Sequence, residues 1–467
     1  MYSKVDKNIL DKLRETCGNE YVLTDKSQMM GFKGDETAAL EKRVNVRFPE
    51  AVVKPGSTEE VSMIMTIAYN EGVPVTPRGG GTGLSGGVVP IHGGIVLSLE
   101  RLDNIIEIDT ENLMAVVEAG VTLEALYDAV EEVGLYFPPH PGDEGAHIGG
   151  SIAANAGGAR CVRYGVIRNY VQGMKVVLPK GDILNLKGKL LKNNTGYALR
   201  HLLIGSEGTL GIITEATLRL MPSSIEPTIL VAPYKKREDA VRTIPEILRS
   251  GIIPLGVEYI EKEALTRSEK HLDRSWPTKK GAASLMIMVS GRGEEEILSK
   301  SQEIMEICEK NNAIDVFLAS EDREKENVME IRSKIYDALK EDSLEIFDIT
   351  VPPSKIVDFM KKVEEVSGKY DLPMPAYGHG ADGNIHVHVM NTDMETYEKI
   401  KNELFKKSNK LGGVITGEHG VGVTKIDDLH FSRSDKELEL MRTIKSVFDP
   451  KNILNTGKVV PGPFEEE

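Results

Sequence analysis

Residues 77–87 read PRGGGTGLSGG, with six glycines in eleven positions. This much bare backbone between two strand-like runs suits the wrapping of a phosphate, because consecutive N–H groups can turn toward an anion. The spacing Gly81-x-Gly83-x-x-Gly86 also matches the Rossmann dinucleotide fingerprint, but that fingerprint must open a helix after its strand. Here residues 88–99 form a turn and then a β-branched run, which predicts a strand. The sequence therefore argues against a Rossmann nucleotide site.

A helix is predicted before the glycine loop instead. Ser57 and Glu60 have the spacing of a capping box, and Gly72 stands where the helix is expected to end. The apolar face between them consists of Val61, Ile64, Met65 and Ala68. The expected local order is strand, helix, strand, glycine loop, strand.

The bulk composition predicts a folded globular protein. At 467 residues the chain has room for two or three domains, and its formal net charge of −15 argues against nucleic acid or an anionic membrane as the primary partner. The three cysteines Cys17, Cys161 and Cys308 form no C-x-x-C pair, which argues against an iron–sulfur cluster and fits a reducing compartment. The sequence contains neither a signal peptide nor an apolar run of the roughly 18–20 residues that a membrane span needs. We expect a cytoplasmic protein without a transmembrane segment.

Shifts in composition divide the chain into four parts, and its fold class is predicted as α+β. Residues 1–45 are a polar, helical lead-in, and residues 46–222 alternate short β-rich runs with a few helices and many glycines. Residues 223–416 alternate amphipathic helices with strands, which favours an antiparallel sheet with helices packed on one face. Residues 417–467 end in turns and are expected to return to the first domain. The expected elements are helices over 123–133, 237–250, 293–311, 355–367 and 394–411, and strands over 212–220, 284–290 and 313–318.

Two further glycine-rich stretches lie in the same part of the chain as the first. Residues 138–158 read PPHPGDEGAHIGGSIAANAGG, in which three prolines stiffen the approach and small residues let the backbone pack against a flat ligand. Residues 205–211 read GSEGTLG. Tight turns between strands would explain any one of these stretches, whereas the three together favour a cofactor site.

Three of the ten histidines fall within residues 378–388, GHGADGNIHVH. The central ADGN is a tight-turn sequence, so a hairpin would bring His379 close to the start of the returning strand. On that strand His386 and His388 share a face, because side chains alternate with a period of two. A lone histidine is more often structural, but two that flank one hairpin turn favour a site.

A glutamate–histidine pair follows in the glycine-rich loop 416–422. His379, His386 and Glu418 would offer two imidazoles and one carboxylate to a divalent ion, with positions left open for a substrate. This ligand set suits zinc, manganese or ferrous iron without selecting among them. Because neighbouring side chains diverge, His419 would face the substrate instead and accept a proton at neutral pH.

The glycine and histidine runs together resemble one superfamily of flavoenzymes. They read GGGTGLSGG (79–87), IGGSIAANAGG (148–158), GSEGTLGIITE (205–215), GHGADGNIH (378–386) and GEHGVG (417–422). Their order and wording resemble the vanillyl-alcohol-oxidase superfamily, with its PCMH-type FAD domain, and within it the branch of the glycolate oxidase D-subunit and the D-lactate dehydrogenases. The resemblance implies an FAD domain of two α+β subdomains, then a cap domain with an antiparallel sheet and flanking helices, then a C-terminal return. It also implies noncovalent FAD, although His140 and His147 lie in the region where other members attach FAD covalently.

The resemblance assigns cofactor contacts residue by residue. The FAD pyrophosphate would lie on Gly79, Gly80, Gly81, Thr82, Gly83 and Ser85. The isoalloxazine and ribityl side would be lined by Pro141, Gly142, Gly149, Gly150, Ser151 and Asn155, with Gly158, Tyr164 and Gly165 beyond them. The adenosine portion would contact Glu207, Gly208 and Ile213, and Asn455 is also expected to bind the cofactor. Ser151 is a mild departure, since relatives commonly carry asparagine there.

The same resemblance implies how a substrate would be bound and oxidised. Arg332 would clamp the substrate carboxylate with its guanidinium fork. His419 would take the proton of the α-hydroxyl, and the metal ion would bind the carboxylate and hydroxyl. The 2-hydroxyglutarate enzymes carry a lysine fifteen positions beyond this arginine, where this chain has Phe347. An apolar residue there disfavours a second carboxylate and favours a small monoacid.

The expected activity is that of an FAD- and metal-dependent D-2-hydroxyacid dehydrogenase acting on D-lactate, with a glycolate dehydrogenase or oxidase subunit as the alternative. Because no motif for an electron-carrying cluster is found, we expect an external protein acceptor such as electron-transferring flavoprotein. Two interpretations from other classes stay open: a metal-dependent hydrolase whose glycines only form turns, and an electron-transfer subunit whose flavin is structural.

Overall fold

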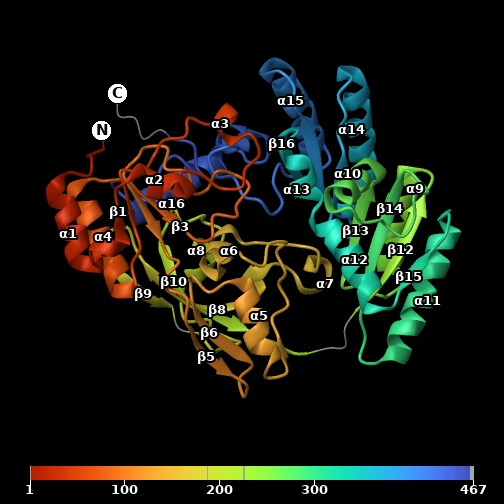
Figure 1. Ribbon diagram of the computed structural model, residues 1–467, viewed down its shortest axis with the longest axis horizontal. Helices are drawn as coiled ribbons and strands as arrows, with labels where there is room; N and C mark the ends of the chain where they lie inside the picture. The colour runs from red at the N-terminus through yellow and green to blue at the C-terminus, as the bar shows by residue number, and fades with distance from the viewer. Residues whose placement is uncertain (1, 187, 224–226, 463–467) are drawn as a thin grey trace. The chain divides into compact units, whose positions relative to one another are not determined.

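The computed structural model describes residues 2–186, 188–223 and 227–462. The chain folds as two compact units, which Figure 1 colours along the sequence. The first unit is assembled from Met1–Ala156, Val166–Ser223 and Glu418–Glu467. The second consists of Gly157–Gly165 and Ser224–Gly417. Helices and strands occur in both units, and the predicted α+β class is confirmed.

The first unit contains a four-stranded sheet in the order β1-β2-β4-β3. Its strands are β1 (Val22–Leu23), β2 (Ala51–Val53), β3 (Val75–Arg78) and β4 (Ile95–Ser98). β2, β3 and β4 are parallel, and α4 (Thr58–Glu71) connects β2 to β3. The glycine loop lies between β3 and β4, so the predicted order of strand, helix, strand, loop and strand is confirmed. The polar lead-in joins the same sheet, because β1 pairs with β2.

The capping of α4 matches its sequence signals with one difference. Ser57 Oγ accepts the N–H of Glu60 at 3.1 Å, and Gly72 ends the helix with a φ of 71°. The Glu60 carboxylate, however, accepts the N–H of Gly56 at 2.7 Å. The return bond of the predicted capping box is therefore displaced by one residue, which still satisfies a backbone donor at the helix start.

A five-stranded antiparallel sheet in the order β5-β6-β10-β8-β9 also belongs to the first unit. Its strands are β5 (Ile105–Asp109), β6 (Met114–Glu118), β8 (Val171–Val177), β9 (Ile183–Leu186) and β10 (Ile212–Arg219). A two-stranded ribbon pairs β7 (Leu135–Tyr136) with β11 (Met221–Pro222). The other helices of the unit are α1 (Lys7–Cys17), α2 (Lys26–Met29), α3 (Leu40–Arg43), α5 (Leu123–Glu131), α6 (Ile148–Ala154), α8 (Arg200–Leu203) and α16 (Asp435–Phe448). The predicted strand over 212–220 and helix over 123–133 are confirmed as β10 and α5.

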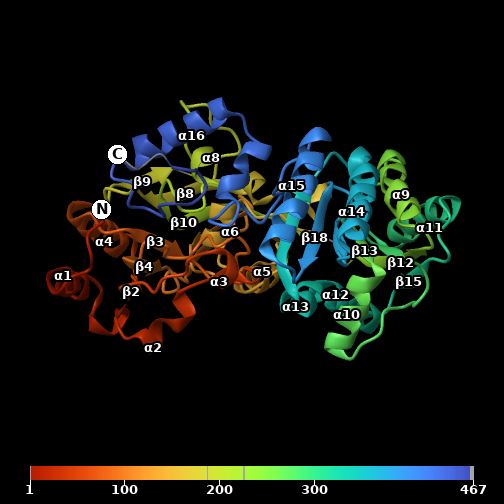
Figure 2. The same ribbon diagram turned by 90° about the horizontal axis from the view of Figure 1, so that it is seen from above.

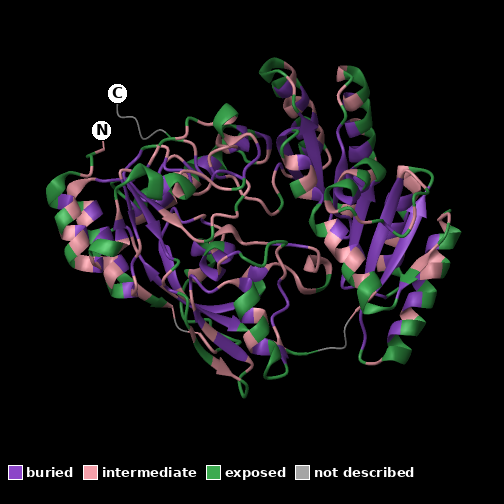
Figure 3. Cartoon of the chain, viewed as in Figure 1, coloured by how far each residue is buried: buried purple, intermediate pink, exposed green. Residues whose placement is uncertain are grey.

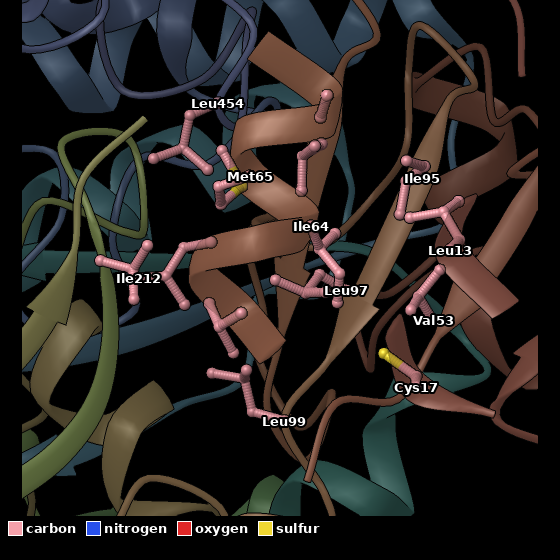
Figure 4. Close-up of a cluster of buried hydrophobic side chains, with 14 of the residues drawn as sticks. Leu13, Cys17, Val53, Ile64, Met65, Ile95, Leu97, Leu99, Ile212 and Leu454 are labelled. Atoms are coloured by element: carbon pink, nitrogen blue, oxygen red, sulfur yellow. The ribbon is translucent and has the colours of Figure 1, made fainter. Parts of the chain in front are cut away.

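The core of the first unit packs around α4 (Figure 4). Ile64 and Met65 of this helix are fully buried among side chains that include Leu97 of β4. Leu454, near the C-terminus, enters the same core, because the N–H of Val75 donates to the Ile453 carbonyl at 2.8 Å. Burial of each such aliphatic side chain contributes about 1.5–3 kcal/mol. The C-terminal segment is therefore part of the fold that carries the glycine loop.

The second unit is built on a seven-stranded antiparallel sheet in the order β15-β12-β14-β13-β17-β18-β16. Its strands are β12 (Thr228–Tyr234), β13 (Gly256–Glu261), β14 (Ala283–Val289), β15 (Phe317–Ala319), β16 (Ser343–Thr350), β17 (Ala376–His379) and β18 (Asn384–Met390). The predicted strand over 284–290 corresponds to β14. The predicted strand over 313–318 is reduced to β15, because the N–H of Ala313 binds the Cys308 carbonyl at the end of the preceding helix.

Helices cover both faces of this sheet, not the single face that the sequence analysis predicted (Figure 2). One layer contains α9 (Arg237–Arg249), α11 (Glu294–Lys310), α14 (Ile356–Tyr370) and α15 (Met394–Lys410). The other contains α10 (Lys262–Leu272), α12 (Asp322–Ser333) and α13 (Ile335–Lys340). Successive residues along β14 and β18 are consequently all buried, as Figure 3 shows for the strands of this unit. The short helix α7 (Cys161–Tyr164) contacts β13.

Short 3₁₀ turns connect several of these elements. They are η1 (Asn19–Tyr21), η2 (Met30–Phe32), η3 (Ile167–Asn169), η4 (Pro353–Lys355) and η5 (Ile426–Phe431). Across the ranges that the structure describes, no helix combines the length and the apolar character that crossing a bilayer requires.

Candidate functional site

The first two glycine-rich stretches lie against each other in the first unit. A side chain built at Gly79 would come within 3.6 Å of the Gly150 Cα, and one at Gly80 within 3.1 Å of the Gly145 carbonyl oxygen. Gly81 has a φ of +77°, and a side chain there would collide with the guanidinium of Arg78. The tight backbone approach at Gly80 and the positive φ of Gly81 explain why these two positions are glycine. We call the surface formed by residues 79–87 and 142–150 the glycine cradle.

Open space lies next to the glycine cradle. A side chain at Gly142 or Gly150 would meet no atom within 4 Å, whereas one at Gly149 would strike Ala119. The start of α6 therefore packs on one side and presents bare backbone on the other. A cavity of about 580 Å³ adjoins the cradle, and its lining combines residues 30–46 with Arg78, Gly80, Gly81 and Thr82. Room beside bare backbone fits an extended ligand such as FAD.

The third glycine-rich stretch is joined to the cradle by the C-terminal segment. Asn455 Nδ2 donates to the carbonyl of Gly87 at 3.1 Å and to that of Glu207 at 2.7 Å. The Glu207 carboxylate accepts the N–H groups of Val421 and Gly422, each at 2.8 Å. Burial raises the pKa of Glu207 even though these two N–H groups oppose the shift. Since its carboxylate is engaged by the chain, Glu207 would contact a cofactor through its backbone.

The remaining residues with expected cofactor contacts have varied surroundings. Ser85 is buried, and its carbonyl accepts the N–H of Val423 at 3.0 Å. Ile213 lies on β10 and is buried, with 4% of its surface exposed. Asn155 ends α6 in the left-handed region with a φ of 53°. Within the first unit lie also Gly83, Pro141, Ser151 and Gly208, whereas Gly158, Tyr164 and Gly165 belong to the second unit.

Polar side chains of the second unit gather on one face of four neighbouring strands. Strand register makes Glu258 of β13 the partner of His379 on β17, and His379 the partner of Asn384 on β18. In the next row Tyr377, His386 and Asp348 are partners across β17, β18 and β16. Cross-strand partners share a face of a sheet. We call the set Glu258, Asp348, Tyr377, His379, Asn384 and His386 the histidine face.

Glu258 connects two of the predicted site residues. Arg332 of α12 donates to Glu258 Oε2 through Nε at 2.8 Å and also through Nη2, while Glu258 Oε1 lies 2.7 Å from His379 Nδ1. The Glu258 side chain is fully buried. Burial alone would raise its pKa, but Arg332 and His379 outweigh that effect and lower the pKa of Glu258 to about 2. An ionised carboxylate can only accept, so Nδ1 of His379 carries the hydrogen.

Asp348 holds the loop that precedes the glutamate–histidine pair. Its Oδ2 accepts the Thr416 hydroxyl at 2.7 Å and the N–H of Gly417 at 2.9 Å, and its Oδ1 accepts Asn384 Nδ2 at 2.7 Å. His386 Nδ1 lies 3.7 Å from the same Oδ1. Because one peptide bond joins Gly417 to Glu418, this anchor limits where Glu418 can lie.

The predicted metal and catalytic residues are divided between the two units. His379 and His386 belong to the second unit, where their rings lie beside each other with centroids 5.6 Å apart. Glu418 and His419 belong to the first unit. Imidazole nitrogens and carboxylate oxygens are ligands that zinc, manganese and ferrous iron accept, so the donor set fits a divalent ion.

Four members of the histidine face were not among the predicted site residues: Tyr377, Asn384 and the two carboxylates, Glu258 and Asp348. Glu258 stands between Val257 and Tyr259, and Asp348 stands between Phe347 and Ile349. A charged residue inside an apolar strand is the signal that could have identified each of them, because a buried carboxylate requires a partner.

Phe347 does not lie where the sequence analysis placed it. Its ring packs on Phe405 and Tyr397 of α15, with centroids 5.0 Å and 6.1 Å away. Phe347 is therefore on the sheet face opposite to Asp348. The expectation that Phe347 disfavours a second carboxylate on the substrate is wrong, because its side chain does not lie on the histidine face. Ile346, the register partner of His388, lies on the histidine side of β16 and is 4% exposed.

Comparisons with known proteins identify family domains in both parts of the chain. Residues 49–187 match the FAD binding domain family, and residues 226–459 match the C-terminal domain of FAD linked oxidases. The chain is 43% identical to a D-lactate dehydrogenase of Archaeoglobus fulgidus over 92% of this chain and 95% of that one. It is 37% identical to the glycolate oxidase subunit GlcD of Bacillus subtilis over 97% of each.

Solved structures show the same fold. The structure of p-cresol methylhydroxylase with substrate bound superposes with a TM-score of 0.80 at 19% identity, covering 98% of each chain. At this identity the superposition shows the fold alone, and it is the matched family domains and the two relatives that confirm the resemblance to the FAD-linked oxidases. The chain contains both family domains, is similar to these relatives over most of its length and has a cradle suited to FAD. It therefore belongs to the FAD-linked oxidases.

Proposed function

We propose that this protein is an FAD- and metal-dependent D-2-hydroxyacid dehydrogenase that oxidises D-lactate to pyruvate. The observation that carries the proposal is the histidine face, a buried row of imidazoles and carboxylates beside Arg332, in a chain with an FAD-binding domain. FAD, when bound, supplies a two-electron acceptor for the hydride of the substrate carbon, and a divalent ion, when bound, supplies positive charge to the substrate oxygens. The proposed metal ligands are His379, His386 and Glu418.

Arg332 would bind the substrate carboxylate. A guanidinium has five N–H donors on two edges, and Glu258 takes the edge formed by Nε and one hydrogen of Nη2. The second edge, formed by Nη1 and the other hydrogen of Nη2, retains the fork geometry that a carboxylate prefers. The Arg332 side chain is 14% exposed and lies over the ring of Tyr377 at 4.9 Å, which fixes its plane. The same side chain can thus pair with the protein and with substrate.

His419 would accept the proton of the substrate hydroxyl. It follows Glu418 in the glycine loop, and its Nε2 lies 3.8 Å from Glu418 Oε1. A neutral imidazole is a suitable acceptor for such a proton at neutral pH. The hydroxyl proton would go to His419 and the hydride of the same carbon to the two-electron acceptor FAD, so the alcohol would become a ketone.

The apolar side chains on the histidine side of the sheet support a small monoacid as the substrate. Ile346 and Tyr377 lie beside His386 and His388, and Ile346 offers no charge to a second carboxylate. A small monoacid fits this environment better than a diacid. The name of the Archaeoglobus fulgidus relative supports D-lactate, and that of the Bacillus subtilis relative supports glycolate as the alternative.

Electrons would leave to an external protein, for which electron-transferring flavoprotein is our candidate. The negative net charge of −15 supports docking of a partner with a basic face. Capture of partners from native cells followed by mass spectrometry tests this part. Reoxidation of the flavin only by membrane quinones would contradict it.

Anaerobic reduction of the purified protein tests the activity. We expect D-lactate to bleach the flavin absorption faster than glycolate, L-lactate or D-2-hydroxyglutarate, and a chelator to slow the bleaching. A colourless protein would favour the metal-dependent hydrolase, and a coloured protein that no hydroxyacid bleaches would favour the electron-transfer subunit. Faster bleaching by glycolate would establish the alternative substrate.

A further inference from the structure

One buried carboxylate contacts two groups of the proposed site at once. Glu258 Oε2 accepts Arg332 Nε at 2.8 Å, and Oε1 lies 2.7 Å from His379 Nδ1. The three residues come from different elements: β13, α12 and β17. The Glu258 side chain has no exposed surface, whereas Arg332 and His379 are 14% and 10% exposed. Glu258 therefore lies behind the two residues, on the side away from solvent.

We propose that Glu258 is a positioning residue that sets the geometry of both the metal ligand His379 and the substrate-binding Arg332. The inference rests on the proposed function, and it assigns a role to a residue that the motifs do not contain.

The bond to His379 determines which nitrogen can serve as a ligand. With Nδ1 donating to Glu258, the ring can bind an ion only through Nε2. A carboxylate in this position also orients the ring and strengthens the remaining nitrogen as a ligand. The register pairing of Glu258 with His379 keeps their backbones at a fixed separation, so the orientation comes from the sheet.

The bond to Arg332 fixes the guanidinium in its plane. Two nitrogens of one edge converge on a single oxygen, and Tyr377 lies against the flat face of the group at 4.9 Å. The opposite edge is thereby held in one direction, which preserves the fork for a substrate carboxylate. Because both contacts use the same carboxylate, a change at Glu258 should weaken metal binding and substrate binding together.

The chain contains a matched control on the same strand. Glu261 is also a buried glutamate of β13 and also pairs with an arginine, Arg237, whose Nε lies 2.9 Å from Glu261 Oε1. Three residues apart on a strand, Glu258 and Glu261 project to opposite faces. Glu261→Gln thus makes the same substitution at a second buried glutamate of the strand, beside a more exposed arginine, without touching the histidine face.

The test compares Glu258→Gln with Glu261→Gln in the full-length, flavin-loaded protein. We expect Glu258→Gln to lower the affinity for Zn²⁺, measured by titration of the metal-free protein, by about 10–100-fold. The KM for D-lactate should rise about 10-fold or more while the flavin content stays at the wild-type level. Glu261→Gln should leave zinc affinity and KM unchanged.

Two results would overturn the proposal: wild-type zinc affinity in Glu258→Gln, or equal losses in both variants, which would indicate general destabilisation. If Glu258→Gln does not fold, Glu258→Asp decides, because it keeps the charge on a side chain one methylene shorter that cannot reach both partners. Unchanged zinc affinity and KM in Glu258→Asp would also refute the role. Zinc affinity is measured without substrate, so a failure of D-lactate as the substrate would be recognised separately.

Discussion

The glycine cradle of the first unit and the histidine face of the second are built in different ways. The cradle is backbone against backbone, with Gly79 and Gly80 packed on Gly150 and Gly145. The histidine face is made of side chains, and its polar atoms come from four strands of one sheet. Backbone sites depend on the space and backbone conformation available at particular glycines, whereas side-chain sites depend on charge and hydrogen-bond direction. The two sites should consequently fail in different ways when they are mutated.

The largest effect is expected from His419→Ala, which removes the proposed proton acceptor. Loss of a general base lowers kcat by about 10²–10⁴-fold. Flavin content should stay unchanged, because the cradle is not touched. Steady-state turnover with D-lactate and the flavin absorption of the same sample measure both quantities. His430→Ala serves as the control, since His430 is exposed and bonds only locally to the Asp427 carbonyl; equal kcat in the two variants would refute the role of His419.

Asp348→Asn should have the next largest effect and should act on the metal. The change removes a buried negative charge that accepts bonds from Thr416, Gly417 and Asn384. We expect the affinity for zinc or manganese to fall about 10–100-fold. Equilibrium dialysis with metal analysis provides the measurement. Asp337→Asn, which alters only an exposed pair with Lys334, should bind the ions as wild type does; a similar loss there would point to surface charge.

Gly81→Ala should damage the cradle and leave the histidine face intact. Its Cβ would lie 2.1 Å from Arg78 Nη2 at a φ of +77°, whereas a Cβ at Gly134, with a φ of +72°, would meet no atom within 4 Å. Both variants carry the strain of a left-handed alanine, about 1–2 kcal/mol, but only Gly81→Ala must also displace Arg78. We expect at least about 10-fold weaker FAD retention in Gly81→Ala than in Gly134→Ala. Flavin released during gel filtration measures this difference, and equal retention would contradict the collision.

The smallest effect is expected for a charge cluster of the second unit on α15, which packs on the sheet face opposite the histidine face. Hydrogen bonds from Lys362 and Lys369 lower the pKa of Glu403 from 4.5 to about 2. The unfolded chain then binds more protons than the folded one between these values, so the stabilisation is present above pH 4.5 and is lost as the pH falls toward 2. Glu403→Gln should lower the free energy of unfolding by no more than about 1 kcal/mol at pH 7. Urea unfolding should show this difference shrinking below pH 4.5; a constant difference would exclude the titration of Glu403 as its source.

Much of the cradle could be predicted because its signals are contiguous in the sequence. The glycines of residues 79–87 and 148–158 form short runs, and each run reports a local need for bare backbone. The hairpin that pairs His379 with Asn384 is likewise local, since its turn lies in ADGN. Where neighbouring residues determine the structure, the sequence pattern was sufficient.

The partners of the histidines could not be predicted, because they depend on the register of strands far apart in the chain. Glu258 reaches His379 only through the pairing of β13 with β17, and Asp348 reaches His386 through that of β16 with β18. The error at Phe347 has the same origin. A shift of one residue along a strand moves a side chain to the other face, so Ile346 and not Phe347 lies on the histidine side.

The return of the C-terminus to β3 has a consequence for how the protein is made. The N–H of Asn455 donates to the carbonyl of Val75 at 2.7 Å, so the strand that contains Val75 obtains this neighbour only after residues 76–454 have been translated. The inserted unit, nearly all of it within Ser224–Gly417, is complete on the ribosome before that neighbour emerges. A ribosome that stalls between the two events would release a chain with one finished half and one open sheet edge, a species suited to recognition by chaperones and proteases.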